Sequence, residues 1–169
     1  MFFPMRLDRF HRNSTLAVMV LVPLVLLIPL TTLPPGAPVW PMVLLLALLA
    51  VVLGVAWAMA PRGILLKGGE LLVVRRAWPS LRLPISSVKA VEMGPSMLGA
   101  WRVAGTGGFF GSYGLFYAPG VGRFRLYATR GTHPVTIHRK GLLPVVVTPE
   151  DPEAFVEAVN VYRNPEAYL

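Results

Sequence analysis

The chain changes its hydrophobic pattern near residue 61, and the two parts predict different structures. From residue 13 to residue 61 there is no Asp, Glu, Lys or Arg. Two apolar runs lie in this part, residues 15–33 and 41–60, and each has the roughly 20 residues with which a helix crosses a bilayer. The proline-rich segment 34–38 between them favours a tight turn. The pattern predicts a transmembrane helical hairpin over residues 15–60.

Aromatic and basic residues at the ends of the runs predict how the hairpin lies. Trp40 and Trp57 are near opposite ends of the second run, where indole rings favour the membrane interface. The connecting turn is uncharged, so the positive-inside rule places both termini in the cytoplasm and residues 1–14 in a basic cytoplasmic N-terminus. The expected location is the inner (cytoplasmic) membrane of the cell, with the chain crossing it twice. The flanking basic residues are Arg6, Arg9, Arg12, Arg62 and Lys67.

A cleaved signal peptide is the alternative interpretation of the first run, because a basic start and an apolar stretch are both present. The run is long, however, and prolines follow it in place of a clean cleavage site. We therefore favour a retained helix.

From residue 62 onward, short apolar runs alternate with Gly and Pro, which is typical of a β-rich domain. Alternation with a period of two is clear in residues 123–128 and 135–138. This spacing favours an antiparallel barrel or sandwich. Strands are predicted at residues 63–67, 70–77, 81–85, 88–93, 101–105, 123–129, 135–139 and 143–147.

The end of the chain has a helical pattern. Asp151 is a good N-cap residue, and Pro152 suits the first helical position. Phe155, Val159 and Tyr162 recur at helical spacing and form one apolar stripe. We expect this amphipathic helix to cap the strands, so that residues 62–169 form one cytoplasmic domain.

Three segments in this domain resemble the bacterial PH-domain (pleckstrin-homology-like) membrane proteins. Residues 105–116 are GTGGFFGSYGLF, residues 125–129 are RLYAT, and residues 146–155 are VVTPEDPEAF. The resemblance implies a PH-like barrel or sandwich capped by one C-terminal helix. Similar proteins often carry two membrane helices before the domain, and no catalytic residues come with the motif.

Charge divides the domain into a basic part and an acidic end. Glu70 and Glu92 are the only acids between residues 62 and 149, whereas Arg163 is the only cation after residue 149. Each cation near an anionic leaflet contributes about 1 kcal/mol of attraction, so a positive-inside composition explains this basicity. Recognition of a specific anionic lipid headgroup is the alternative, and it needs converging cations. The candidates are Arg75, Arg76, Arg102, Arg123 and Arg125.

Residues 105–117 are rich in glycine and aromatic residues. A phosphate-binding glycine loop needs a helix after it, and a strand pattern follows here instead, so sharp bends between strands are the favoured explanation. Phe109 and Phe110 are expected either to cover the open end of the barrel or to enter the bilayer interface.

The chain has few residues suited to catalysis or metal binding. It contains no Cys. His133 and His138 have no evident acidic partner, and three suitably spaced zinc ligands are not found. The sequence therefore predicts a non-enzymatic protein without cofactor or metal. A membrane tether and an acidic helix also argue against nucleic-acid binding.

Three functions are compatible with these features. The leading one is a membrane-anchored scaffold or assembly unit, the second is a sensor of anionic lipid headgroups or peptides, and the third is an accessory subunit of a membrane enzyme or transporter. The third is weakest because the apolar runs carry no ionisable residue. An unprotected strand edge at residues 143–147 and close helix packing at Gly54 favour a homo-oligomer or another membrane-complex partner.

Overall fold

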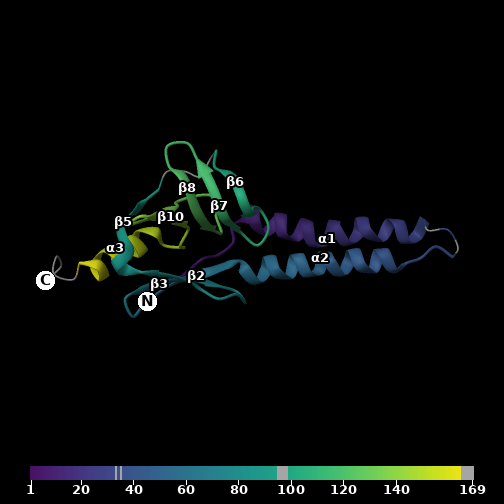
Figure 1. Ribbon diagram of the computed structural model, residues 1–169, viewed down its shortest axis with the longest axis horizontal. Coiled ribbons are helices and arrows are strands. Elements are labelled where there is room, and N and C mark those ends of the chain that lie inside the picture. The colour runs from purple at the N-terminus through teal and green to yellow at the C-terminus, as the bar shows by residue number, and fades with distance from the viewer. Residues whose placement is uncertain (33, 35, 95–98, 165–169) are drawn as a thin grey trace.

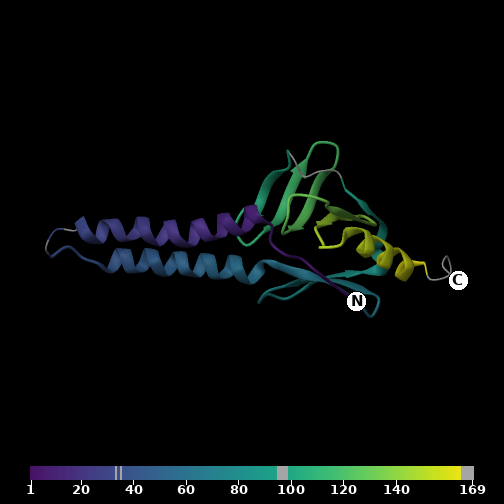
Figure 2. The same cartoon turned by 180° about the vertical axis from the view of Figure 1, so that it is seen from behind.

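The computed structural model describes the chain except residues 33, 35, 95–98 and 165–169. Two long helices, α1 (Arg9–Thr32) and α2 (Trp40–Met59), lie side by side and project from one end of a β-rich domain (Figures 1 and 2). Helix α1 begins at Arg9, earlier than the predicted residue 15. Asp8 precedes the helix and caps its polar first turn. Residue 33, the predicted end of the first run, lies outside the described residues.

One of these helices meets the requirements of a membrane span. In the described part of the chain, α2 is long and apolar enough to cross a bilayer, and its side chains are largely exposed. The structure thus supports one candidate span, and the two-span hairpin remains a prediction.

The described strands form two sheets, which confirms the predicted β-rich domain. The first has the order β1-β2-β3-β4 and consists of Phe2–Pro4, Pro61–Lys67, Glu70–Arg75 and Leu81–Pro84. The second has the order β5-β9-β10-β8-β7-β6. In chain order its strands are Val88–Met93, Trp101–Thr106, Ser112–Ala118, Gly122–Ala128, Val135–Arg139 and Leu142–Val147. A short 3₁₀ turn, Ile85–Ser87, connects the two sheets.

Strand β10 lies inside its sheet, and this corrects two predictions. It pairs with β9 in antiparallel and with β8 in parallel orientation, so the domain is not purely antiparallel. The segment that includes β9 supplies the crossover connection that parallel neighbours need. A free edge at residues 143–147 is also wrong, because β10 has a paired strand on each side; Val145, Val146 and Val147 are in addition fully buried. Such a continuous apolar run belongs to a strand covered on both faces.

Strand β7 occupies residues that the sequence pattern assigned to a loop. It pairs with β6 on one side and β8 on the other. Gly105 and Gly114 face each other in the β6–β7 pair with φ of 124° and 132°. A Cβ on either glycine would collide with the backbone of the other strand. The glycines therefore permit a close backbone approach that other residues do not.

Helix α3 (Pro152–Arg163) packs against the domain as predicted. Asp151 Oδ1 accepts a hydrogen bond at 3.0 Å from the third helical residue, and Phe155 and Val159 are fully buried. The Phe3 ring of β1 meets the Phe155 ring edge-on, with centroids 5.2 Å apart. The N-terminal strand is thus part of the same core as the C-terminal helix.

The other face of the second sheet carries a smaller apolar cluster. The Phe116 and Phe124 rings stack there with centroids 6.3 Å apart. The buried members of this cluster are Phe116, Phe124, Leu126, Ala128 and Val146.

Candidate functional site

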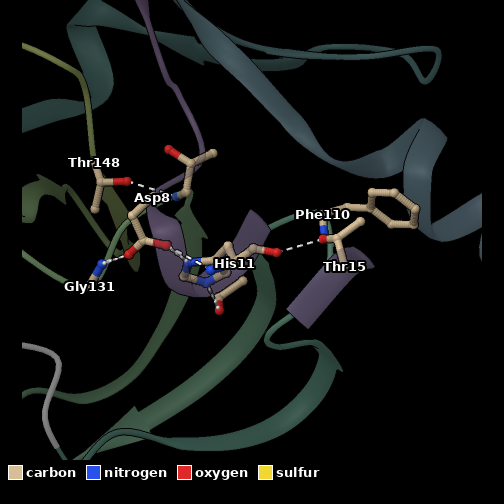
Figure 3. A network of polar contacts seen from close by, with 8 residues as sticks. Asp8, His11, Thr15, Phe110, Gly131 and Thr148 are labelled. Atoms are coloured by element: carbon tan, nitrogen blue, oxygen red, sulfur yellow. Dashed lines mark hydrogen bonds and ion pairs between the residues drawn. The ribbon is translucent and has the colours of Figure 1, made fainter. Parts of the chain in front are cut away.

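The start of α1 is fastened to the second sheet by a chain of polar contacts (Figure 3). Asp8 is the residue before the helix, and its Oδ1 accepts a hydrogen bond from His11 N at 2.8 Å, as an N-cap does. Its Oδ2 accepts a bond from Gly131 N at 3.3 Å. The His11 ring is buried, with Nδ1 2.8 Å from Asp8 Oδ1 and Nε2 3.1 Å from Ser112 Oγ. Helix α1 is therefore attached to β7 and to the loop after β8.

Two threonines extend this network. Thr15 Oγ1 donates to the carbonyl one helical turn earlier at 2.7 Å and accepts a hydrogen bond from Phe110 N at 2.8 Å. The Phe110 ring points away from Thr15 (Figure 3). Thr148 Oγ1 accepts from Thr129 N at 2.9 Å, and Thr129 O accepts from Asp8 N at 3.0 Å. The contacts span α1, the β6–β7 turn and the ends of β8 and β10.

The carboxyl group of Asp8 has a perturbed acidity. Burial raises the pKa of Asp8, but hydrogen bonds from His11, the charge of that ring and the hydrogen bond from Gly131 together outweigh burial. The pKa of Asp8 therefore lies below its ordinary value of 3.8. The fold favours the ionised carboxylate at this junction.

Helix α2 is attached to the domain by its own contacts. Only Ala60 separates its last residue from β2, and Ala60 O accepts a hydrogen bond from Arg76 N at 3.0 Å. Tyr113 of β7 donates its hydroxyl to Ala56 O. Burial raises the pKa of Tyr113, while a hydrogen bond with Thr106 and the charge of a nearby arginine lower it by less. The domain is thus joined to both helices through side-chain contacts as well as through the chain.

Two of the five predicted cations share one face of the second sheet, and Arg75 of β3 reaches that face from the first sheet. Arg123 and Arg125 are exposed on β8, and alternate strand positions place them on the same face as Tyr127. Arg75 donates from Nη2 to the Tyr127 hydroxyl at 3.0 Å, with its guanidinium 5.4 Å from the ring centroid. Arg139, which the sequence did not single out, lies nearby: burial lowers its pKa, and the charge of Arg125 lowers it further.

Arg102 lies on the opposite face. It is paired with Phe116 of β7, whereas Arg123 is paired with the next residue, Tyr117. Because paired residues share a face and successive residues alternate, Arg102 and Arg123 leave the sheet in opposite directions. The five candidates therefore do not form one cluster.

Arg76 lies instead near Arg62, which the sequence identified only as a basic residue flanking the helices. Arg62, Arg76 and Trp57 line a pocket of about 430 Å³ at the domain end of α2. The register of the β2–β3 pair shifts between Pro61 and Gly63, and such a bulge re-aims the side chain of the extra residue. Proximity of Arg62 to Arg76 thus depends on strand pairing, which a sequence pattern does not display.

The predicted interface aromatics lie at both ends of the helices. Trp40 is exposed at the end of α2 far from the domain, and Trp57 is partly exposed at the near end. Phe110 is buried where the helices meet the domain, and Phe109 lines a groove between α2 and the β6–β7 pair. Phe110 is thus packed at the junction, and the insertion of either ring into the bilayer interface stays a prediction.

Residues 64–162 match the family described as bacterial PH domain, which is more than half of the chain. The chain belongs to the bacterial PH domain family. No curated protein and no solved structure matches it. The matched residues run from β2 to α3 and confirm the resemblance given by the sequence for the domain itself.

The junction contacts lie partly outside the matched part of this PH domain protein. Asp8, His11 and Thr15 precede it, and so do Trp57 and Arg62. The fastening of α1 and the basic pocket at α2 therefore combine the domain with segments beyond the family match.

Strand β6 of the PH domain presents an exposed apolar edge that the sequence pattern does not reveal. Among the described strands its only neighbour is β7. Trp101 is 71% and Val103 is 53% exposed on it, and Tyr117 of β7 is 43% exposed beside them. Exposed aromatic and β-branched residues on a strand edge are typical of a surface that pairs with another chain.

One histidine of the PH domain has an acidic partner that the sequence did not reveal. His138 Nε2 lies 2.7 Å from Glu92 Oε1, across the β5–β9 pair. The expectation that His138 lacks such a partner is wrong, because strand pairing brings together residues far apart in the chain. Within the described ranges no group of three or more His, Cys, Asp or Glu side chains is arranged to hold a metal ion.

Proposed function

We propose that this protein is a non-enzymatic, membrane-anchored assembly unit. In this proposal, α1 and α2 cross the inner membrane, both termini face the cytoplasm, and the PH domain is held at the cytoplasmic surface. Copies of the chain then associate through the exposed edge of β6.

The attachment of the domain to both helices is the observation that carries the proposal. Asp8 and His11 fasten α1 to the second sheet, and Tyr113 fastens α2 to the same sheet. A domain joined by a flexible linker would sample many orientations, whereas a domain fastened at two helices keeps one. A fixed domain presents the same strand edge at a constant height above the membrane, which suits ordered assembly.

A second copy is the occupant that fits the β6 edge best. Its exposed backbone groups can pair with an identical strand, and a two-fold contact is self-complementary. Trp101 and Val103 would then be buried, and Arg102 is the only charged residue on this strand. Confinement of the chain to a membrane raises its effective concentration and so favours weak self-contacts.

Light scattering on the purified full-length protein, in mild detergent and in nanodiscs, tests this proposal. We expect particles larger than the 18.5 kDa monomer after the detergent or lipid contribution is subtracted. The double variant Trp101→Lys/Val103→Lys should become monomeric. Trp78→Lys is the matched control, because Trp78 is 46% exposed outside β6.

A monomer at every concentration would remove self-assembly as the function. If the wild-type protein is monomeric but captures another membrane protein through β6, the accessory-subunit alternative replaces it.

A further inference from the structure

Two pockets at the domain end of the helices are both lined by Trp57 and Arg76. The first, about 430 Å³, is the basic pocket completed by Arg62. The second, about 560 Å³, is an apolar groove between the two helices, lined among others by Met19 of α1 and Gly54 of α2. A charged pocket and an apolar groove that share two lining residues match a molecule with an anionic head and a hydrocarbon tail.

We propose that this site binds one anionic phospholipid per chain. The phosphate lies on Arg62 and Arg76, and one acyl chain lies in the groove between α1 and α2. Lipid binding is a property additional to self-assembly. It rests on the proposed insertion of α2 into the membrane, which the cysteine labelling described in the Discussion tests separately.

The two arginines are suited to a phosphate group. Planar guanidinium groups donate paired hydrogen bonds that match phosphate geometry. In the described part of the chain no carboxylate forms an ion pair with Arg62 or Arg76. Arg6, by contrast, has Nε 3.4 Å from Glu150 Oε2. The pocket therefore holds positive charge that no acid in the described part of the chain neutralises.

The groove explains why the ligand is a lipid and not free phosphate. Its wall on α2 includes Leu53 and Gly54, and nothing lies within 4 Å of the place where a Cβ on Gly54 would stand. Trp57 lies at the boundary between groove and pocket, and indole rings favour the depth of lipid headgroups. A phosphate bound beside Trp57 is thus at the level where a bilayer presents it, with the acyl chain directed along the helices.

Native mass spectrometry of the full-length protein in mild detergent, titrated with phosphatidylglycerol, tests the proposal. We expect one lipid to bind in preference to phosphatidylcholine. Arg62→Gln/Arg76→Gln should weaken binding at least about tenfold, because charge-assisted hydrogen bonds are lost. Arg123→Gln/Arg125→Gln removes the same charge from β8 and should change binding less than about twofold. Equal losses in the two double variants would show diffuse attraction and overturn the proposal.

Two further arms separate the lipid from its headgroup. Gly54→Leu fills the groove and should weaken phosphatidylglycerol binding. Its thermal unfolding temperature should equal that of the wild type, which checks that the helices remain folded. Glycerol 3-phosphate, the soluble headgroup alone, should bind weakly and equally to wild type and Gly54→Leu. Tight binding of glycerol 3-phosphate, or unchanged lipid binding in Gly54→Leu, would mean that the groove holds no acyl chain.

Discussion

Asp8 has two roles at the junction between α1 and the PH domain. As the N-cap it satisfies an amide at the start of the helix, and through Gly131 N it holds the loop after β8. Both hydrogen bonds, together with the His11 ring, favour the ionised carboxylate, so the folded pKa lies below the ordinary value of 3.8. A carboxyl group with a lowered folded pKa contributes stability that is complete above the unfolded pKa and is lost as pH falls through the folded pKa.

Variants of Asp8 separate the charge from the cap. Asp8→Ala should lower the free energy of unfolding by about 1 kcal/mol at neutral pH, because the cap is lost. Asp8→Asn keeps a capping oxygen but cannot ionise. Its free energy of unfolding should be lower than that of the wild type at neutral pH, and this difference should shrink as pH falls below 3.8. Thermal unfolding of the full-length protein between neutral and strongly acidic pH measures both effects. A deficit of Asp8→Asn that stays constant with pH would contradict the role of the ionised carboxylate.

Phe155 is the residue through which α3 enters the core. Its ring is fully buried, so Phe155→Ala should cost about 3–5 kcal/mol in the free energy of unfolding. Tyr162→Phe is the control on the same helix: Tyr162 is 45% exposed and loses only one hydrogen bond, so the cost should be below about 1 kcal/mol. Denaturant unfolding followed by circular dichroism measures both. A cost below about 1 kcal/mol for Phe155→Ala would show that α3 is not packed on the core.

Among the elements, β1 shows how the N-terminus contributes to the PH domain. It pairs with β2, and the Met1 amino group donates to Leu66 O at 2.9 Å. The Phe3 ring adds the edge-on contact with Phe155. Phe3→Ala should therefore destabilise the domain by about 1–3 kcal/mol. Phe3→Leu, which keeps most of the apolar volume, should cost less, and equal stability of Phe3→Ala and wild type would exclude β1 from the core.

The elements that the sequence predicted are those with a strong local pattern. Residues 88–93 and 135–139 were predicted with the bounds that the structure has, because apolar runs with clear turn signals define them. Strand β1 is three residues long, ends in Pro4 and pairs with a partner far along the chain. Strand β7 contains Gly114, which weakens the local strand signal even though Gly105 opposite makes the pairing fit. Both missed strands depend on tertiary partners.

The candidate site was predictable only in parts. Trp57 and Arg76 were each singled out, one as an interface aromatic and one as a candidate lipid contact. The sequence pattern marks Arg62 only as a flanking charge, because the β2–β3 bulge at this residue has no signature in the sequence. Period-two alternation placed Arg123 and Arg125 on one face, but pairing of β6 with β7 was needed to place Arg102 on the other.

For the whole molecule, the proposed function depends on the membrane topology, because the contacts of α1 and α2 hold the PH domain on one side of the helices. The basic pocket and the apolar groove have their proposed role only if the PH domain faces an anionic leaflet, and the proposed assembly at the cytoplasmic surface needs the same orientation. Basic residues on both flanks of the helices and an uncharged connection between them favour that orientation. With α1 and α2 side by side, the connection at their far ends would lie on the opposite side of the membrane from the domain (Figure 1).

The absence of native cysteine makes this orientation directly measurable. Val39→Cys introduces an exposed thiol beside the far end of α2, and Lys140→Cys introduces one in the turn between β9 and β10. In cells whose outer barrier admits a membrane-impermeant maleimide, we expect Val39→Cys to be labelled without lysis. Lys140→Cys should be labelled only after the inner membrane is opened, because the proposed topology places the PH domain in the cytoplasm. Labelling of Lys140→Cys in intact cells would invert the topology and remove the anionic inner leaflet from the proposed lipid site. Protection of both thiols until lysis would instead mean that α1 and α2 do not form a spanning hairpin.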